Sequence, residues 1–275
     1  MTDTGWTTLR VRRFSESAPV VRALFALGAE GVQELDGEVV THLRDIDEAA
    51  ALAAIGGADA GADVEFARLD RQDWTAEWRA RVGAHRLGRL VVTPPWLAAA
   101  YSEHERVVID PAMAFGTGEH ETTRGILRLM QRVIKPDDVV ADLGAGSAVL
   151  AIAAARLGAR RAIAIEQDHD AIGNAEQNIA ANGVSDRVSV IEGDAAVLLP
   201  LVAPVRVILA NIISAVLLEL LPAIEQALTA EGLAILSGIL IDERPDMEAA
   251  LAQRAWRVVE TDQEGLWWSV TVTRA

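Results

Sequence analysis

The C-terminal half of the chain alternates short apolar segments with longer helix-forming ones, and this alternation constrains the fold more than any other feature. Strand-like segments are expected at 138–146, 160–166, 187–194, 205–211 and 233–240. Helix-like segments are expected at 148–158, 168–183, 215–232 and near 243–254. Strands separated by crossover helices predict a parallel, doubly wound sheet of the α/β class.

Two more strands are expected at the C-terminal end, "WRVVET" and "LWWSVTVTR", joined by "DQEG". This connection is too short for a crossover, so one of the two strands must run antiparallel to its neighbour. The sequence therefore predicts a Rossmann-like sheet of seven strands. Trp267 and Trp268 are adjacent in a strand, so at most one of them faces a site at the sheet edge.

The segment "DLGAGS" ends the first of these strands and opens a helix. Gly144 and Gly146 allow the backbone to turn sharply and to approach a ligand closely. The helix N-terminus adds free N–H groups and the positive end of a dipole. A dinucleotide fingerprint needs a third small residue where Val149 stands, which disfavours a nicotinamide cofactor.

Polar residues end the next three strands. Glu166, twenty residues after Gly146, is placed to accept the ribose hydroxyls of an adenosine, Asp194 to reach an adenine edge, and Asn211 ends the fourth strand. The carboxyl ends of parallel strands meet in one crevice, which indicates an adenosyl cofactor. The alternative is that these residues are ordinary caps, with Asp194 simply starting a helix.

The stretch "DPAMAFGTGEHETT" (110–123) lies before the first strand of the sheet. A phosphate-binding loop follows a strand and carries a lysine, so this stretch is predicted to cover a different ligand. Thr122 and Thr123 are expected to start the next helix. His120 has two open interpretations, a general base or a residue that orders its loop through a backbone hydrogen bond.

The N-terminal part has a different organisation. Residues 1–72 predict a small α+β domain of β-α-β-β-α-β order and ferredoxin-like type. Residues 73–96 are expected to form a linker helix and a strand, and 97–275 the sheet domain. The glycine-rich segment 56–63 is expected to be a flexible turn.

The composition narrows the classes of function. The chain has 275 residues and no cysteine, which excludes disulfides, thiolate metal sites and cysteine nucleophiles, and no metal is expected. It shows neither a secretory signal nor an apolar run of about 18 residues, so a cytoplasmic protein without a membrane partner is expected. The net charge of −15 favours a basic partner over nucleic acid.

Several motifs carry a family resemblance. "DLGAGS", Glu166, Asp194 and "ANIIS" resemble the ordered motifs of seven-stranded S-adenosylmethionine-dependent methyltransferases. "DPAMAFGTGEHETTR" resembles the Phe-Gly-Thr-Gly-x-His-x-Thr-Thr signature of the ribosomal protein L11 methyltransferases (PrmA type). "DWTAEWRARVGAHRLGRLVVTPPW" is similar to the linker of that family, and the resemblance covers essentially the whole chain.

The resemblance implies an enzyme that moves methyl groups from S-adenosyl-L-methionine to lysine or N-terminal amines of a basic large-subunit ribosomal protein. It implies a monomer whose N-terminal domain recognises that substrate. The residues implied to bind the cofactor are Phe115, Thr117, Thr122, Thr123, Gly144, Gly146, Glu166, Asp194 and Asn211. Asn211, beside the methyl group, and His120 are the implied catalytic residues.

Two positions depart from the family pattern. Ala148 stands where the third glycine of the loop is usual, and Glu166 stands where aspartate would be common. Two other functions remain open, an RNA or small-amine methyltransferase with the same cofactor site and a non-catalytic cofactor-binding scaffold. "NIIS" lacks the aromatic residue that often stacks a flat base, and the acidity of the chain argues against RNA.

Overall fold

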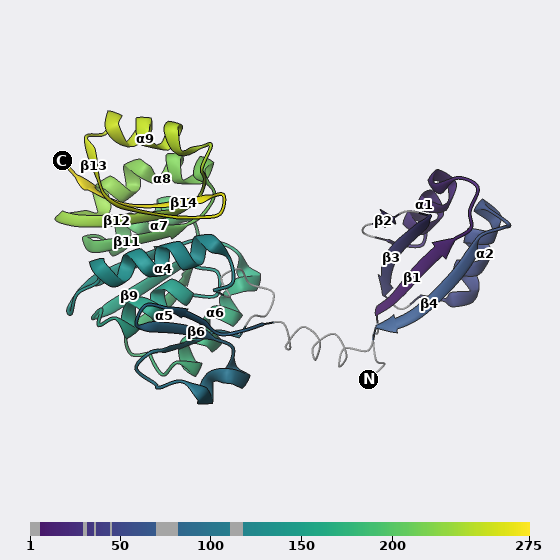
Figure 1. The fold of residues 1–275 in the computed structure, drawn as a ribbon, viewed down its shortest axis with the longest axis horizontal. Coiled ribbons are helices and arrows are strands. Elements are labelled where there is room, and N and C mark those ends of the chain that lie inside the picture. The colour runs from purple at the N-terminus through teal and green to yellow at the C-terminus, as the bar shows by residue number, and fades with distance from the viewer. Residues whose placement is uncertain (1–5, 30–31, 36, 45, 70–81, 111–117) are drawn as a thin grey trace. The chain divides into compact units, whose positions relative to one another are not determined.

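The computed structural model describes residues 6–29, 32–35, 37–44, 46–69, 82–110 and 118–275. The chain divides into two compact units, residues 1–81 and 82–275 (Figure 1). No helix in the described ranges is long and apolar enough to cross a bilayer.

The first unit has the β-α-β-β-α-β order of a ferredoxin-like fold, as predicted. Its elements are β1 (Trp6–Arg12), α1 (Ser17–Ala26), β2 (Val32–Leu35), β3 (Glu38–Arg44), α2 (Glu48–Ala58) and β4 (Asp63–Leu69). The strands pair antiparallel in the order β2-β3-β1-β4. Leu9 and Leu24 are fully buried between the sheet and the helices. The prediction of a turn over 56–63 was partly wrong, because α2 continues through Gly56 and Gly57.

The second unit begins with a small sheet that the sequence did not predict. β5 (His85–Leu87) and β6 (Leu90–Thr93) form a hairpin with Gly88 at φ 60°, and β6 pairs parallel with β7 (Arg106–Val108). A short 3-10 helix, η1 (Pro95–Ala100), lies between β6 and β7. Residues 85–93, expected to contribute one strand to a linker, therefore belong to the second unit.

The main sheet confirms the predicted fold class. Its strands are β8 (Val139–Leu143), β9 (Arg161–Glu166), β10 (Val188–Glu192), β11 (Val205–Asn211), β12 (Leu228–Leu240), β13 (Trp256–Glu264) and β14 (Trp267–Arg274). They lie in the order β10-β9-β8-β11-β12-β14-β13. β14 runs antiparallel to β12 and β13, as its short connection predicted.

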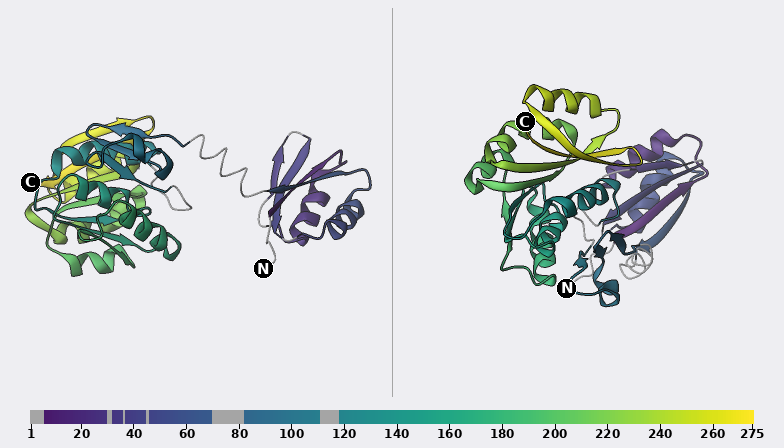
Figure 2. Two further views of the ribbon diagram at one scale, coloured as in Figure 1. Left: turned by 90° about the horizontal axis from the view of Figure 1, so that it is seen from below. Right: turned by 60° about the vertical axis from the view of Figure 1, so that its left-hand side comes forward.

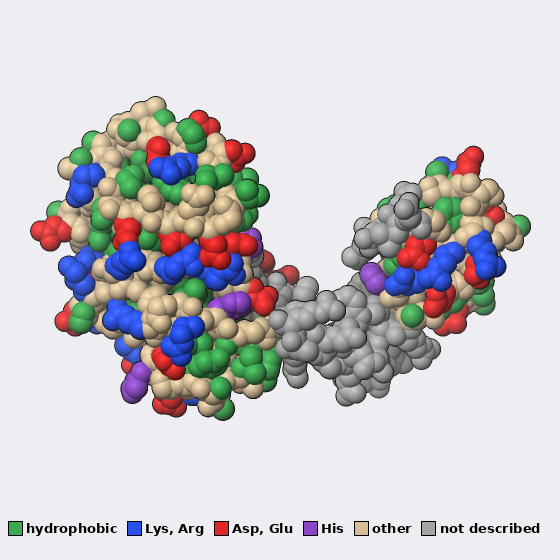
Figure 3. Space-filling model, viewed as in Figure 1, with side chains coloured by type: hydrophobic (Ala, Val, Ile, Leu, Met, Phe, Trp, Pro, Cys, Tyr) green, Lys and Arg blue, Asp and Glu red, His purple; other side chains and the backbone are tan. Residues whose placement is uncertain are grey.

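Helices cover both faces of this sheet (Figure 2). Successive residues of a strand point to opposite faces, and since apolar residues occupy both positions, each face packs against helices. The helices are α4 (Glu121–Val133), α5 (Val149–Arg156), α6 (His169–Ala181), α7 (Ala195–Val202), α8 (Ser214–Ala227) and α9 (Arg244–Gln253). Val140 belongs to the hydrophobic cluster that includes residues of α4, α5 and α6 on one face, and its neighbour Ala141 belongs to the cluster that includes residues of α7, α8 and α9 on the other. α4 contacts β12, β13 and β14, and rows of basic and acidic side chains lie next to each other on that side (Figure 3).

Two boundaries in this unit differ from the prediction. The helix expected to reach residue 232 ends at Ala227, and β12 starts at Leu228. Leu228 is buried and pairs with Val205 of β11, so sheet pairing outweighs the local helix preference. β13 extends through Glu264, which leaves Gly265, at φ 57°, and Leu266 as a two-residue hairpin connection.

Candidate functional site

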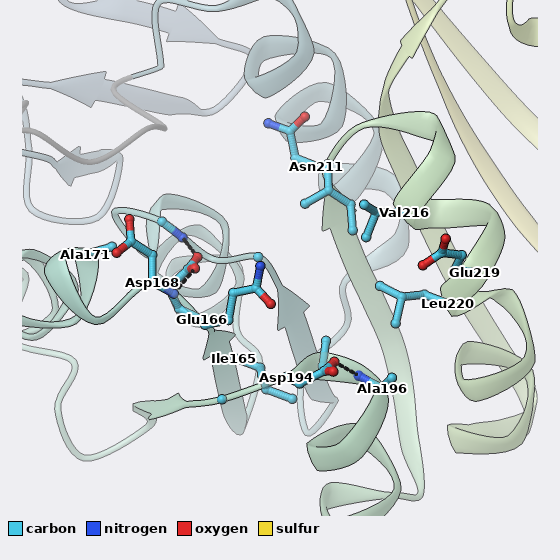
Figure 4. A pocket seen from close by; sticks show the side chains of 16 residues that line it. Ile165, Glu166, Asp168, Ala171, Asp194, Ala196, Asn211, Val216, Glu219 and Leu220 are labelled. Atoms are coloured by element: carbon cyan, nitrogen blue, oxygen red, sulfur yellow. Dashed lines mark hydrogen bonds between the residues drawn. The ribbon is translucent and has the colours of Figure 1, made fainter.

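A cavity of about 650 Å³ opens at the carboxyl ends of the parallel strands, where the sequence predicted a crevice (Figure 4). Five of the expected site residues line it together with parts of α7 and α8. They are Gly144, Gly146, Glu166, Asp194 and Asn211. The strand order therefore gathers residues that lie up to 67 positions apart in the sequence.

The glycine loop between β8 and α5 depends on its lack of side chains. Gly144 has φ 63°, and a Cβ atom placed there would lie 2.5 Å from Cγ2 of Ile212. Gly146 has φ 50°. Ala148 also adopts the left-handed conformation, at φ 62°, with its side chain fully buried outside the cavity lining. The loop thus tolerates alanine at the third position and needs glycine at the first.

Glu166 is held by the backbone around it. Its Oε2 accepts a hydrogen bond from the Gly146 N–H at 2.8 Å, and its Oε1 accepts one from the Asp168 N–H at 2.9 Å. Each carboxylate oxygen has a second lone pair. The group is therefore fixed at the end of β9 with capacity to accept two more hydrogen bonds, which suits a ribose diol.

Asp194 serves as the N-cap of α7. Its Oδ1 accepts a hydrogen bond from the Ala196 N–H at 2.8 Å, and the residue lies on the cavity wall (Figure 4). Both interpretations of this residue are compatible, because capping uses one oxygen and leaves the other directed to solvent or ligand.

Asn211 connects the cavity to α4. It ends β11, and its Nδ2 donates a hydrogen bond to Oγ1 of Thr123 at 3.2 Å. Thr122 and Thr123 lie buried in the first turn of α4, as expected, although neither lines the cavity. Ser237 Oγ donates to the Thr122 carbonyl oxygen at 3.0 Å. The start of α4 is thereby fixed beside the ends of β11 and β12.

His120 makes the contacts of a helix cap. Its Nδ1 accepts a hydrogen bond from the Thr122 N–H at 3.3 Å and lies 2.8 Å from Oγ1 of Thr122. Its ring meets that of Trp267 edge-on, with centroids 5.0 Å apart. His120 does not line the cavity. Trp268 is fully buried in the core, whereas Trp267 contacts His120, and neither tryptophan lines the cavity.

Asp142 is a functional candidate that the sequence interpretation missed. It opens "DLGAGS" and is fully buried, and its Oδ2 accepts a hydrogen bond from the Ala151 N–H at 2.9 Å. Burial, together with the charge of Glu166, raises the pKa of Asp142 to about 7. Its Oδ1 has no partner among the described residues. Asp142 does not line the cavity but lies just before the glycine loop that does.

Two asparagines at the end of α6 were also missed, although their spacing of four residues places them on one helix face. Asn182 exchanges two hydrogen bonds with the backbone of Val108, at 2.9 and 2.6 Å. Asn178 accepts from the Asp110 N–H at 2.9 Å and donates to the Ser147 carbonyl at 3.1 Å. They join the backbone at Val108 and at Asp110, where the stretch 110–123 begins, to the glycine loop.

Phe115 and Thr117 lie outside the described residues, as do Trp74 and Trp78 of the linker. Within the part of the chain that is described, no three His, Asp or Glu side chains are arranged to hold a metal ion.

Comparisons with known proteins agree with this architecture. The family model described as Ribosomal protein L11 methyltransferase (PrmA) matches residues 30–275. A ribosomal protein L11 methyltransferase of Synechococcus sp. (strain RCC307) is 38% identical over 209 residues, which cover 74% of this chain and 69% of the relative. One from Desulfitobacterium hafniense (strain DSM 10664 / DCB-2) is 34% identical over 234 residues, covering 84% and 74%.

Among solved structures, the ribosomal protein L11 methylase of Lactobacillus delbrueckii subsp. bulgaricus is similar with a TM-score of 0.62 and 31% identity. The match covers 70% of this chain and 98% of that one. Strand order, cavity and family match agree, and the cofactor they indicate is S-adenosyl-L-methionine. The chain belongs to the ribosomal protein L11 methyltransferase (PrmA) family.

Proposed function

We propose that this protein methylates amino groups of ribosomal protein L11, at lysine side chains or the N-terminus, with S-adenosyl-L-methionine as the methyl donor. The observation that carries the proposal is the cavity lined by Gly144, Glu166, Asp194 and Asn211, in a chain that matches the family over residues 30–275. The net charge of −15 suits a basic protein partner and disfavours direct binding of nucleic acid. We infer a cytoplasmic monomer whose first unit recognises the substrate.

The residues present fit the cofactor. Glu166 would hold the ribose hydroxyls, Asp194 would meet the adenine, and the backbone at Gly144 permits close approach. The N-terminus of α4, with Thr122 and Thr123, has the polarity that attracts a carboxylate.

When bound, the cofactor supplies a methyl group on a positively charged sulfur. The protein's task is to present a neutral amine in line with it. A lysine amine with a pKa of about 10.4 is neutral in roughly one molecule in 10³ at pH 7, which corresponds to about 4–5 kcal/mol. The Asn211 amide donates to Thr123 through Nδ2, which leaves Oδ1 as the acceptor for an amine N–H. An acceptor at that position orients the lone pair of the nitrogen and favours its reaction.

The proposal is tested with the full-length protein, methyl-labelled cofactor and two acceptors, whole ribosomes and free L11 from an undermethylated strain. Mass analysis of proteins and RNA then locates the label. We expect the label only in L11. The Asn211→Ala variant should transfer the methyl group about 10²-fold more slowly. Label only in RNA, or cofactor binding without transfer to any protein, would contradict the proposal.

A further inference from the structure

A ladder of ion pairs joins α4 to β13. Arg124, Arg128 and Arg132 are four residues apart and share one face of α4. Glu260, Asp262 and Glu264 are two residues apart and share one face of β13. Ion pairs join these arginines to these acidic residues across the two elements. Figure 3 shows adjoining rows of basic and acidic side chains over this part of the second unit.

The contacts within the ladder differ from one arginine to the next. Arg124 donates from Nε and Nη2 to the same Oε1 of Glu264, at 2.9 and 2.6 Å. Arg128 donates from Nε to Oδ2 of Asp262 at 2.8 Å and from Nη2 to Oδ1 at 2.5 Å. Its Nη2 also donates to Oε2 of Glu264 at 2.8 Å. Arg132 pairs with Glu260, and its side chain is 68% exposed. Arg128 therefore has two ionic partners within the ladder, and Arg132 has the most solvent around it.

The contacts of Arg124 and Glu264 lie closest to the site. Arg124 is in the first turn of α4, and its Nη1 also donates to the carbonyl oxygen of Glu119, just before the helix. Its hydrogen bonds are the largest cause that lowers the pKa of Glu264. Thr123 is the preceding residue in the chain and accepts the hydrogen bond of Asn211. The pair thus joins the end of β13 to the same helical turn that contacts Asn211.

We propose that Arg124 and Glu264 are positioning residues for the cofactor site, a role that rests on the function proposed above. Their ion pair fixes the first turn of α4 and thereby the placement of Thr123 and the orientation of Asn211. Arg128 and Arg132 anchor later turns, so they stabilise the helix with less effect on the site. The loss of cofactor affinity on replacing each arginine should therefore be largest for the one nearest the start of α4. The loss of stability should instead be largest for the arginine with the most, and most buried, ionic contacts.

The test uses Arg124→Gln, Arg128→Gln and Arg132→Gln in the full-length protein. Three quantities are measured for each variant: binding of S-adenosylhomocysteine by calorimetry, unfolding in urea, and amide hydrogen exchange at residues 121–124 without ligand. Arg124→Gln should weaken binding by about 10-fold, Arg128→Gln by about 3-fold and Arg132→Gln by less than about 2-fold. Arg128→Gln should show the largest loss of stability, and Arg124→Gln the fastest exchange.

Further variants examine the pair itself. Glu264→Gln should weaken binding like Arg124→Gln. The double variant should lose little more than either, because both single variants remove the Arg124–Glu264 ion pair, and the other bonds of the two residues, to the Glu119 carbonyl and from Arg128, account for any remainder. Arg124→Lys should recover only part of the affinity, since lysine keeps the charge but cannot fork between Glu264 and the Glu119 carbonyl.

Two results would overturn the proposal. One is binding losses that rank in the same order as the stability losses, which would make the ladder a stabilising element only. The other is binding by Arg124→Gln within about 2-fold of the unmodified protein, with unchanged exchange. Neither readout needs a methyl acceptor, so failure to methylate L11 would contradict the proposed function and leave this inference standing.

Discussion

Asn211 Nδ2 donates a hydrogen bond to Thr123 Oγ1 at 3.2 Å, and this bond spans 88 residues of sequence. It joins the strand end that faces the cavity to the first turn of α4, where Thr123 is fully buried. The bond sets the orientation of the amide, so that Oδ1 is the group left for a substrate. The role of Asn211 in presenting an amine therefore depends on a residue outside the cavity.

Thr123→Val removes this acceptor with little change of shape. We expect kcat to fall about 10-fold, because the Asn211 amide loses the partner that orients it, which costs about 1–2 kcal/mol. Thr271→Val is the matched control, since Thr271 is fully buried in β14 and its Oγ1 has no partner among the described residues. Steady-state kinetics with L11 measure both. Equal losses in the two variants would refute the orienting role.

Gly144→Ala and Gly238→Ala both place a Cβ against Ile212, but against different parts of it. Both glycines have positive φ, 63° and 85°, which adds about 1 kcal/mol of strain to an alanine. The new Cβ at 144 meets the side-chain atom Cγ2, whereas the one at 238 meets the backbone carbonyl of Ile212. Gly238→Ala should therefore lose more stability in urea unfolding, since a backbone cannot rotate away.

Ile212→Ala separates the two cases. Gly144→Ala should also weaken binding of S-adenosylhomocysteine, because Gly144 lines the cavity. Ile212→Ala should restore much of that affinity to the Gly144→Ala protein and none of the lost stability to the Gly238→Ala protein. If it rescues both or neither, steric conflict with the Ile212 side chain is not the cause.

Ala148→Gly tests the departure from the family pattern. Glycine would relieve about 1–2 kcal/mol of left-handed strain, but it adds about 0.5–1 kcal/mol of unfolded-chain entropy and removes a buried methyl group worth about 0.8 kcal/mol. These terms nearly cancel, so the free energy of unfolding should change by less than about 1 kcal/mol. Ala148 does not line the cavity, and affinity for S-adenosylhomocysteine should stay within about 2-fold. A gain above about 10-fold by calorimetry would show that the methyl group obstructs the cofactor.

His120 can be tested with a pair of substitutions. His120→Asn keeps a good N-cap for α4, whereas His120→Ala removes it and should cost about 1 kcal/mol of stability. If the residue only caps the helix, His120→Asn retains methyl transfer with an unchanged profile from pH 6 to 9. A loss of transfer in both variants, with a flattened profile, would instead support a general base.

Sequence patterns predicted the features of the fold and site that depend on local rules. Strand and helix periodicity indicated the doubly wound sheet, and Gly144, Glu166 and Asn211 fell at strand ends that its topology brings together. The Arg124–Glu264 pair could not be predicted, because 140 residues separate its members and charge pairing has no local pattern. The early start of β12 was missed because Leu228 gains its partner only in the assembled sheet.

The burial of Asp142 gives a pH dependence with a definite sign. Its folded-state pKa of about 7 lies above the ordinary value of 3.8, so between these values the folded protein holds a proton that the unfolded chain has released. Stability is therefore lost as pH rises toward 7, by at most about 4 kcal/mol. Asp142→Asn keeps an oxygen to accept from the Ala151 N–H and has no charge to bury.

We therefore expect the cofactor-free Asp142→Asn protein to be more stable than the unmodified protein at pH 8, with a smaller difference at pH 5.5. The sequence pI of about 4.7 sets the lower limit of the useful range, because proteins associate near zero net charge. Urea unfolding at five pH values between 5.5 and 8 measures the slope. From pH 5.5 to 7 the difference should grow by about 2 kcal/mol. Parallel slopes for the two proteins would show that Asp142 is ionised throughout this range, with its Oδ1 satisfied by solvent.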